Sequence, residues 1–263
     1  MEKKIINDSK KIVIKIGSST ITSQDGTIDK KFLDNLAGQV KALMDMGKRI
    51  VIVSSGARIA GVGTLGKWSR KEDIHYKQAL CAIGQVELMD SYRKIFDKCG
   101  LHVGQLLLTK EDFRDKARTL NIRNTLFTLL DEGVVPIINE NDTVCVEEIK
   151  IGDNDMLAAY TTVLWGGDLL IILSDIEGIY NKNPQDYKDA KLIEIIEDIE
   201  GIENSISLDG KSSFGTGGIA TKILAAKEVS KYGANTIVAK GKKENILLKL
   251  LNGEAKGTLF LST

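Results

Sequence analysis

Short apolar runs alternate with segments of helical periodicity along almost the whole chain. The runs expected to form strands are Lys11–Ile16, Arg49–Val53, Val103–Leu108, Val134–Asn139, Leu169–Leu173, Leu192–Ile196, Thr236–Ala239 and Thr258–Leu261. The segments expected to form helices are Asp29–Met46, Glu72–Lys98, Thr119–Glu132, Asp153–Trp165, Ile219–Tyr232 and Lys243–Leu251. Near-continuous apolar strands separated by helices are typical of a mostly parallel sheet with helices on both faces. The sequence therefore predicts an α/β fold, a three-layer αβα sandwich around a mostly parallel sheet, built as a single domain over residues 1–263.

Sheets of this kind bind their ligands at the carboxyl ends of the strands. The residues that follow five of the predicted strands are mostly small or polar: Gly17–Ser19, Ser54–Gly56, Asn139–Asp142, Ser174–Asp175 and Lys240–Gly241. We therefore expect a binding site along this edge of the sheet.

Two clusters rich in Asn and Asp lie close together in the middle of the chain. The first is Asn139–Asp142, and the second is Asp153–Asp155, which runs directly into a predicted helix. Amides and carboxylates at this density are costly to desolvate unless a cation or a hydrogen-bonding group lies against them. The clusters therefore predict a ligand that carries positive charge, a metal, or both.

Lys15 lies inside an apolar strand, one residue before the start of the sequence Ile16-Gly17-Ser18-Ser19. The apolar residues around it favour an interior strand over an exposed edge strand, and a lysine buried there needs an anionic partner. The glycine and the two serines allow backbone N–H groups to approach phosphate oxygens closely.

Two further segments are suited to anions. Ser54–Ala57 leads from a strand into a helix, and the N–H groups at a helix start attract a carboxylate or a phosphate. A plain turn with a serine cap would look the same. The glycine-rich segment 215–218 precedes Lys222 in the first turns of a helix, where a lysine opposes the helix dipole. A loop that carries a cation to a transferring phosphoryl group would explain it.

The stretch Gly61–Gly66 matches the G-x-G-x-x-G pattern of dinucleotide-binding loops, and with Lys67 it resembles a Walker A motif. It does not directly follow a strand, no acidic residue stands where the ribose contact would need one, and Trp68 replaces the Ser or Thr that holds Mg²⁺. We therefore predict a flexible glycine-rich surface loop near the site instead.

Composition excludes several classes of protein. Basic and acidic residues are equal in number, 36 each, whereas nucleic-acid binding usually leaves a basic surplus. No apolar run is long enough to cross a membrane. The first residues are polar, and a signal peptide is therefore not expected. Cys81, Cys99 and Cys145 lack metal-ligand spacing and favour a reducing, cytoplasmic setting. His75 and His102 have no triad context.

Two lysines, two anion-binding turns and a cluster of acids and amides fit phosphoryl transfer, which asks the protein mainly to neutralise charge and to align the reactants. Mg²⁺ usually arrives on the nucleotide and keeps several waters. We therefore expect Mg²⁺ with ATP and no dedicated protein site for a metal.

Several segments together resemble the amino acid kinase family, in the family's order and over nearly the whole chain. They are Val13–Ser19, Ile50–Ala57, Gly104–Thr109, Pro136–Asp142, Ile149–Asp155, Gly215–Lys222 and Gly257–Phe260. The resemblance implies transfer of the γ-phosphoryl group of ATP to the side-chain carboxylate of L-glutamate, the first step of proline synthesis. It also implies an αβα sandwich with both substrates at the carboxyl edge of the sheet.

The resemblance also implies roles for individual residues. Lys15 would neutralise the transferring phosphoryl group, Lys222 would assist on the leaving side, and Asp155 would orient both lysines. Ser55, Asp142 and Asn154 would bind glutamate. The implied ATP-binding set is Lys15, Gly17, Ser18, Ser174, Asp175, Thr216, Gly217, Gly218, Ile219, Ala220, Thr221 and Lys222. The N-terminal part would bind mainly glutamate, and the part from about residue 165 mainly ATP.

Three further expectations follow from the same resemblance. Proline would inhibit by competing near the glutamate site, and the chain would form a homo-oligomer, either a dimer or a tetramer. Many family members continue into a C-terminal PUA domain, whereas this chain ends just after Gly257–Phe260, so we expect no PUA domain here.

The charge of the acceptor separates the alternatives within the family. A free amino acid brings an ammonium group, which Asp142 and its amide neighbours would bind. The phosphate dianion of UMP would be repelled there, and N-acetylglutamate lacks the ammonium group. Aspartate remains an alternative acceptor, since one methylene contributes only about 1–3 kcal/mol of discrimination. A module that senses amino acids without turnover is a second alternative, against which both lysines argue.

Overall fold

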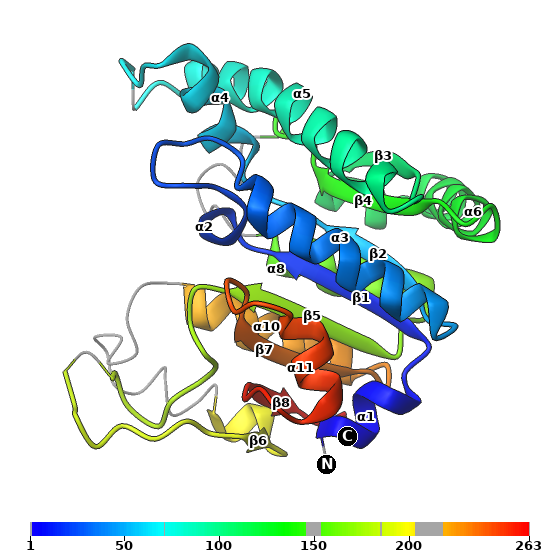
Figure 1. The fold of residues 1–263 in the computed structure, drawn as a ribbon, viewed down its shortest axis with the longest axis vertical. Coiled ribbons are helices and arrows are strands. Elements are labelled where there is room, and N and C mark those ends of the chain that lie inside the picture. The colour runs from blue at the N-terminus through cyan, green and yellow to red at the C-terminus, as the bar shows by residue number, and fades with distance from the viewer. Residues whose placement is uncertain (1, 71, 146–153, 185, 203–217, 263) are drawn as a thin grey trace.

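The computed structural model describes residues 2–70, 72–145, 154–184, 186–202 and 218–262. Its eight strands form one sheet in the order β3-β4-β2-β1-β5-β7-β8-β6 (Figure 1). The strands are β1 Lys11–Ile16, β2 Arg49–Val53, β3 Val103–Leu108, β4 Val135–Glu140, β5 Leu169–Ser174, β6 Ile195–Ile196, β7 Asn235–Lys240 and β8 Thr258–Phe260. All neighbours pair in parallel except β7 and β8, which are antiparallel. The predicted mostly parallel α/β sandwich is therefore confirmed.

Helices cover the sheet on both faces, as Figure 1 shows. The helices are α1 Glu2–Asp8, α2 Ser18–Ile21, α3 Lys30–Asp45, α4 Ala57–Leu65, α5 Ile74–Lys98, α6 Lys116–Asp131, α8 Asp155–Trp165, α10 Gly218–Ser230 and α11 Ile246–Asn252, with a 3₁₀ turn at Lys110–Phe113. Helices α3, α5 and α11 pack on one face, and α6, α8 and α10 pack on the other. Within the described residues, none of these helices has the length and apolar character that crossing a membrane requires.

Strand β1 shows how the sequence pattern produces this layering. Ile12, Ile14 and Ile16 belong to the hydrophobic core on the α3 face, whereas Val13 belongs to the core on the α8 face. Because side chains alternate across a strand, Lys15 points to the same face as Val13. With β2 and β5 on either side, β1 is the interior strand that the sequence predicted. Lys15 is consequently held inside the molecule, 2% exposed.

Some predicted boundaries move, because side-chain caps fix the helix ends. Helix α5 begins at Ile74, where the carboxylate of Asp73 accepts hydrogen bonds from two backbone N–H groups. Helix α6 begins at Lys116 rather than Thr119, because Asp115 accepts from the N–H of Arg118 at 2.8 Å. Such caps stabilise the first turn of a helix.

The prediction of a flexible loop at Gly61–Gly66 is wrong. Residues Ala57–Leu65 form α4, which packs backbone to backbone against α5. A Cβ atom added at Gly61 would lie 2.0 Å from the carbonyl oxygen of Leu80, and one at Gly84 would lie 1.7 Å from that of Ala57. The glycines allow close contact between two helices, and this packing overrides their low helix propensity.

We expect Gly84→Ala to destabilise the fold by at least about 1–3 kcal/mol, the usual range for overpacking, because the new methyl group would meet rigid backbone. Gly38→Ala is the matched control, since Gly38 lies in α3 and an added Cβ would have nothing within 4 Å. This control should gain about 0.5–1 kcal/mol from helix propensity. Urea unfolding of both variants provides the comparison. Equal effects of the two substitutions would contradict close packing between α4 and α5.

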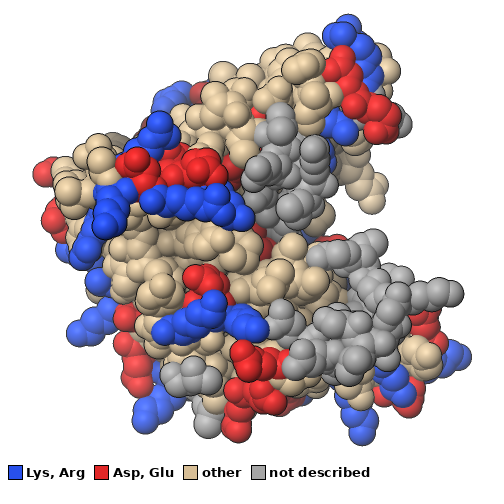
Figure 2. All heavy atoms as spheres, turned by 180° about the vertical axis from the view of Figure 1, so that it is seen from behind, with Lys and Arg blue, Asp and Glu red and all other residues tan. Residues whose placement is uncertain are grey.

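The surface carries both signs of charge. Figure 2 shows acidic and basic side chains interspersed on the face opposite to that of Figure 1. This distribution agrees with the equal numbers of acidic and basic residues in the sequence. Residues 149–153 and 215–217 of the segments that resemble the family, including Asp153, Thr216 and Gly217, lie outside the described residues.

Candidate active site

Three charged side chains meet near the carboxyl end of β1 and form what we call the ionic triad: Lys15, Asp155 and Lys222. The Nζ atom of Lys15 lies 2.6 Å from Oδ1 of Asp155, and the Nζ atom of Lys222 lies 3.0 Å from Oδ2. Asp155 is 0% exposed and Lys222 is 5% exposed. Two cations therefore share one carboxylate in a buried place, and the formal charge of the triad is +1.

Three elements far apart in the sequence supply the triad. Lys15 comes from β1, Asp155 from the first residue of α8, and Lys222 from the first turns of α10. The hydroxyl group of Thr221 donates a hydrogen bond to Oδ2 of Asp155 at 2.9 Å, and the ammonium group of Lys222 donates to the carbonyl oxygen of Gly218 at 3.0 Å. The bond from Thr221 and the ion pair of Lys222 hold the start of α10 against α8, whereas the bond to Gly218 lies within α10. The structure thus brings together the three residues that were expected to act in catalysis.

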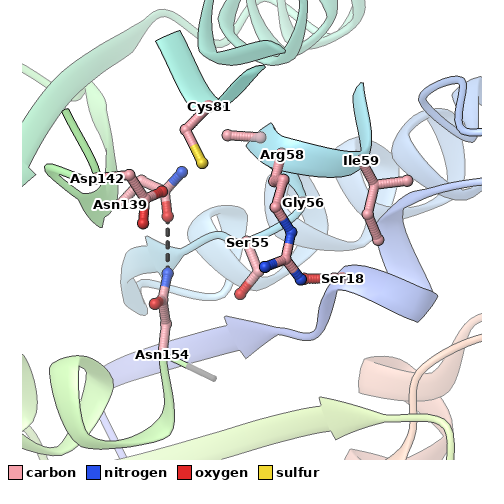
Figure 3. A pocket seen from close by; sticks show the side chains of 10 residues that line it. Ser18, Ser55, Gly56, Arg58, Ile59, Cys81, Asn139, Asp142 and Asn154 are labelled. Carbon is pink, nitrogen blue, oxygen red and sulfur yellow. Dashed lines mark hydrogen bonds between the residues drawn. The ribbon is translucent and has the colours of Figure 1, made fainter. Parts of the chain in front are cut away.

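A second site is the polar pocket drawn in Figure 3. Its lining consists of Ser18, Ser55, Gly56, Ala57, Arg58, Ile59, Cys81, Asn139, Asp142 and Asn154. Asn154 connects the two sites, because it lines the pocket and directly precedes Asp155 of the triad. All three residues expected to bind the acceptor, namely Ser55, Asp142 and Asn154, contribute to this single pocket.

Hydrogen bonds hold two asparagine side chains of the pocket lining in place. The amide nitrogen of Asn154 donates to Oδ1 of Asn139 and to the carbonyl oxygen of Ser54, both at 2.7 Å. The amide nitrogen of Asn139 in turn donates to Oε1 of Gln85 at 2.8 Å. Because these amides are buried and hydrogen-bonded, their orientation is set before any ligand binds. Asn139 belonged to a predicted cluster, but the sequence assigned it no role.

Asp142 is the acidic group of the pocket. Burial raises the pKa of its carboxyl group, while a hydrogen bond from the thiol group of Cys81 and the nearby charge of Arg58 oppose this rise. Burial raises the pKa of the Cys81 thiol far above its ordinary range, so this group stays protonated as a donor. A partly desolvated carboxylate of this kind attracts a cation more strongly than an exposed one.

The raised pKa of Asp142 leads to a prediction about stability. A carboxyl group whose folded-state pKa exceeds its unfolded value stabilises the fold below the unfolded pKa and loses this contribution as pH rises through the folded pKa. Asp142→Asn should therefore raise the melting temperature at neutral pH, by about 2–4 °C for each kcal/mol gained, and the gain should vanish in acid. Thermal unfolding across a pH series measures this.

Asp90→Asn is the control for this prediction, because neighbouring Lys94 and Arg93 lower the pKa of the exposed Asp90 carboxyl group. It should give no gain in stability at neutral pH. If Asp142→Asn were less stable than the parent protein at neutral pH, the assigned effect of burial on Asp142 would be wrong.

The residues expected to bind ATP fall into separate places. Ser18 lines the pocket, and the N–H of Gly17 donates to the carbonyl oxygen of Leu173 at 3.0 Å. Ser174 and Asp175 follow one another at the end of β5, where the Ser174 hydroxyl donates to Asp175 at 2.9 Å. They belong neither to the pocket lining nor to the triad. In the first turns of α10, Gly218 and Thr221 contact the triad, whereas Ile219 packs partly on the core and Ala220 is exposed.

The carboxylate of Asp155 offers little to a metal ion, since each of its oxygens lies within 3.0 Å of a lysine Nζ atom. Among the residues that the structure describes, no three His, Cys, Asp or Glu side chains gather in a group that could hold one.

Two ionisable residues of the pocket were missed in the sequence. Arg58 directly follows the predicted anion-binding turn Ser54–Ala57, so its position at a helix start could have drawn attention to it. Cys81 lies in the middle of a long helix, and no local pattern distinguishes it from a core residue.

Comparison with known proteins shows the family to which this chain belongs. Residues 10–240 match the model of the amino acid kinase family, and the chain belongs to that family. A glutamate 5-kinase of Alkaliphilus metalliredigens (strain QYMF) is 63% identical over 260 residues, which cover 99% of this chain and 98% of that protein. The glutamate 5-kinase of Alkaliphilus oremlandii is 60% identical, over 97% of each chain. That of Syntrophotalea carbinolica is 49% identical over 99% of this chain and 70% of its own length.

Solved structures support the fold. A UMP kinase from Ureaplasma parvum superimposes with a TM-score of 0.68 and 16% identity, over 96% of this chain and 99% of the other. A carbamate kinase from Giardia lamblia bound to AMP-PNP gives a TM-score of 0.67 and 16% identity, over 97% and 99%. At such identities the likeness concerns the architecture alone.

Proposed function

We propose that the protein transfers the γ-phosphoryl group of ATP to the γ-carboxylate of L-glutamate and forms L-glutamyl 5-phosphate and ADP, the first step of proline synthesis. The observation that carries the proposal is the buried ionic triad beside a polar pocket that holds one acidic residue, Asp142. The relatives with 60% and 63% identity over nearly their whole length are glutamate 5-kinases, which supports the same acceptor.

The chemistry needs no general base. A carboxylate is already ionised at neutral pH, so one of its oxygens can attack the γ-phosphorus without losing a proton. The bond from phosphorus to the ADP oxygen then breaks, and ADP leaves. The two histidines are both exposed, and 81% of the His102 side chain is accessible. This exposure agrees with a mechanism in which no imidazole acts.

The triad would supply the electrostatic part of catalysis. During transfer, negative charge spreads over the oxygens of the phosphoryl group and the leaving group. Asp155 holds Lys15 and Lys222 in place, and the two lysines together carry one more positive charge than the carboxylate neutralises. They can therefore stabilise the negative charge of the transition state without reorganising. We assign Lys15 to the transferring phosphoryl group, Lys222 to the leaving side and Asp155 to positioning. Mg²⁺ on the nucleotide would neutralise further phosphate charge.

The pocket would select the acceptor. Asp142 fits the α-ammonium group of a free amino acid and would repel the phosphate of a nucleotide acceptor. We assign Ser55, Asp142 and Asn154 to glutamate. For ATP we propose Gly17, Ser18, Ser174, Asp175 and the segment from Thr216 to Lys222. L-Aspartate is the alternative acceptor, because it lacks only one methylene group.

We further propose that proline competes in the same pocket, since it carries the same two charged groups at its α-carbon. A homo-oligomer, dimer or tetramer, and a cytoplasmic location complete the proposal. Within the described residues, none of the three cysteines is joined in a disulfide, which fits a reducing compartment. Proline should therefore raise the KM for glutamate while the kcat remains constant.

The experiment that tests the proposed function is ADP release with Mg-ATP and one acceptor at a time. The acceptors are L-glutamate, L-aspartate, N-acetylglutamate, carbamate and UMP. We expect turnover with glutamate to exceed that with aspartate, and turnover with the other three to be absent. Turnover with UMP or N-acetylglutamate, and none with glutamate, would refute the proposal.

A further inference from the structure

Arg58 is the one positively charged residue among the described residues that line the pocket. An amino acid substrate brings two charges on its α-carbon, an ammonium group and a carboxylate. Asp142 complements the charge of the first, and Arg58 complements the charge of the second. We propose that Arg58 and the hydroxyl of Ser55 bind the α-carboxylate of the substrate, and thereby select acceptors that retain this group. The inference rests on the proposed function.

The position of Arg58 supports this role. It is the second residue of α4, where the positive end of the helix dipole disfavours a cation but favours an anion. Figure 3 shows its side chain extending into the pocket, with the guanidinium group on the side of Ser18 and Ser55. A carboxylate bound there would meet both the guanidinium group and the first N–H groups of α4. The guanidinium group can hold a carboxylate through two parallel hydrogen bonds.

Ser55 provides an independent indication of a ligand. It is only 6% exposed and lines the pocket, yet its hydroxyl oxygen has no hydrogen-bond partner within the described part of the chain. Buried hydroxyl groups nearly always have a partner, so one without a partner at the wall of a pocket points to a ligand atom. An oxygen of the α-carboxylate would satisfy it.

Arg58 and Asp142 also act on each other across the pocket. The positive charge of Arg58 opposes the effect of burial on the Asp142 carboxyl group, so the two charges are close enough to interact. An ammonium group at Asp142 and a carboxylate at Arg58 would therefore orient the α-carbon in one way. The side chain of the substrate would then be left to reach toward the triad.

The test compares two ligands that differ only in the α-carboxylate. One is L-glutamate, and the other is its α-amide, isoglutamine, which keeps the γ-carboxylate and the ammonium group. We would measure the KM for glutamate and the inhibition constant of isoglutamine for the parent protein and for Arg58→Met. We expect the substitution to weaken glutamate by about 10- to 100-fold through its KM, and isoglutamine by less than about threefold.

Two further variants complete the experiment. Arg58→Lys keeps the charge but loses the paired hydrogen bonds, so it should weaken glutamate by less than Arg58→Met and leave isoglutamine unchanged. Arg93→Met, on the exposed surface of α5, is the matched control and should change neither constant. If Arg58→Met does not fold, Arg58→Lys carries the same comparison.

Two results would overturn the inference: an unchanged KM for glutamate in Arg58→Met, or an equal loss of affinity for both ligands, which would indicate a structural role. Failure of the proposed function is distinguishable from either, because the parent protein itself would then release no ADP with glutamate.

Discussion

Replacing Lys222 by methionine is expected to lower kcat by about 10²- to 10³-fold, while the KM for glutamate changes little. The buried ammonium group of Lys222 lies 3.0 Å from Asp155 at the start of α10, opposite Lys15. In our account it meets negative charge that develops only during transfer, so its loss affects the transition state more than substrate binding. Methionine fills a similar volume, and steady-state kinetics with ATP and glutamate measure the effect.

Lys227→Met on the same helix is the matched control. Lys227 lies in the last turn of α10 and is more exposed than Lys222, so its removal should leave kcat within about twofold. A Lys222→Met enzyme with the kcat of the parent protein would remove this residue from the catalytic machinery.

Replacing Asp155 by asparagine is expected to lower kcat by about 10³-fold or more and to destabilise the fold by about 3–5 kcal/mol. The carboxylate is fully buried between two lysine ammonium groups, at 2.6 Å and 3.0 Å. An amide leaves both cations buried without a counter-charge, and they would move apart or draw in water. Urea unfolding and steady-state kinetics on the same preparation test both parts.

A double variant separates the charge effect from simple damage to the site. In Asp155→Asn combined with Lys222→Met, only one cation remains near the amide, so part of the lost stability should return. Activity should not return, since the double variant lacks both the cation of Lys222 and the carboxylate that positions Lys15. Losses of stability that simply add would contradict the view that Asp155 acts by balancing the two lysines.

The sheet could be predicted well because its central strands are buried on both faces. Uninterrupted apolar runs such as Ile12–Ile14 leave few alternatives to an interior strand. Packing between segments that are far apart in the sequence cannot be predicted from local sequence pattern. Gly61 was predicted to lie in a flexible loop and Gly84 in the interior of a helix, yet each allows two helices to touch at the backbone. Only the pairing of α4 with α5 shows this.

The same division holds for the site. Lys15 was recognisable because a charged residue inside an apolar strand requires a partner, and the structure provides Asp155. The local sequence pattern could not show that Lys222 shares the same carboxylate. Helices α8 and α10 are far apart in the sequence, and only the folded chain brings them into contact. Arg58 was missed because its proposed role depends on Asp142, which lies across the pocket on a different segment of the chain.

Hydroxylamine trapping tests the central claim most directly. An acyl phosphate reacts with hydroxylamine to give a hydroxamate and phosphate, whereas other phosphorylated products do not. With Mg-ATP, L-glutamate and hydroxylamine, we predict the γ-hydroxamate of glutamate in equal amount to ADP, and its loss in Lys222→Met. Release of ADP without a hydroxamate, or a hydroxamate on the α-carboxyl group, would contradict phosphoryl transfer to the γ-carboxylate.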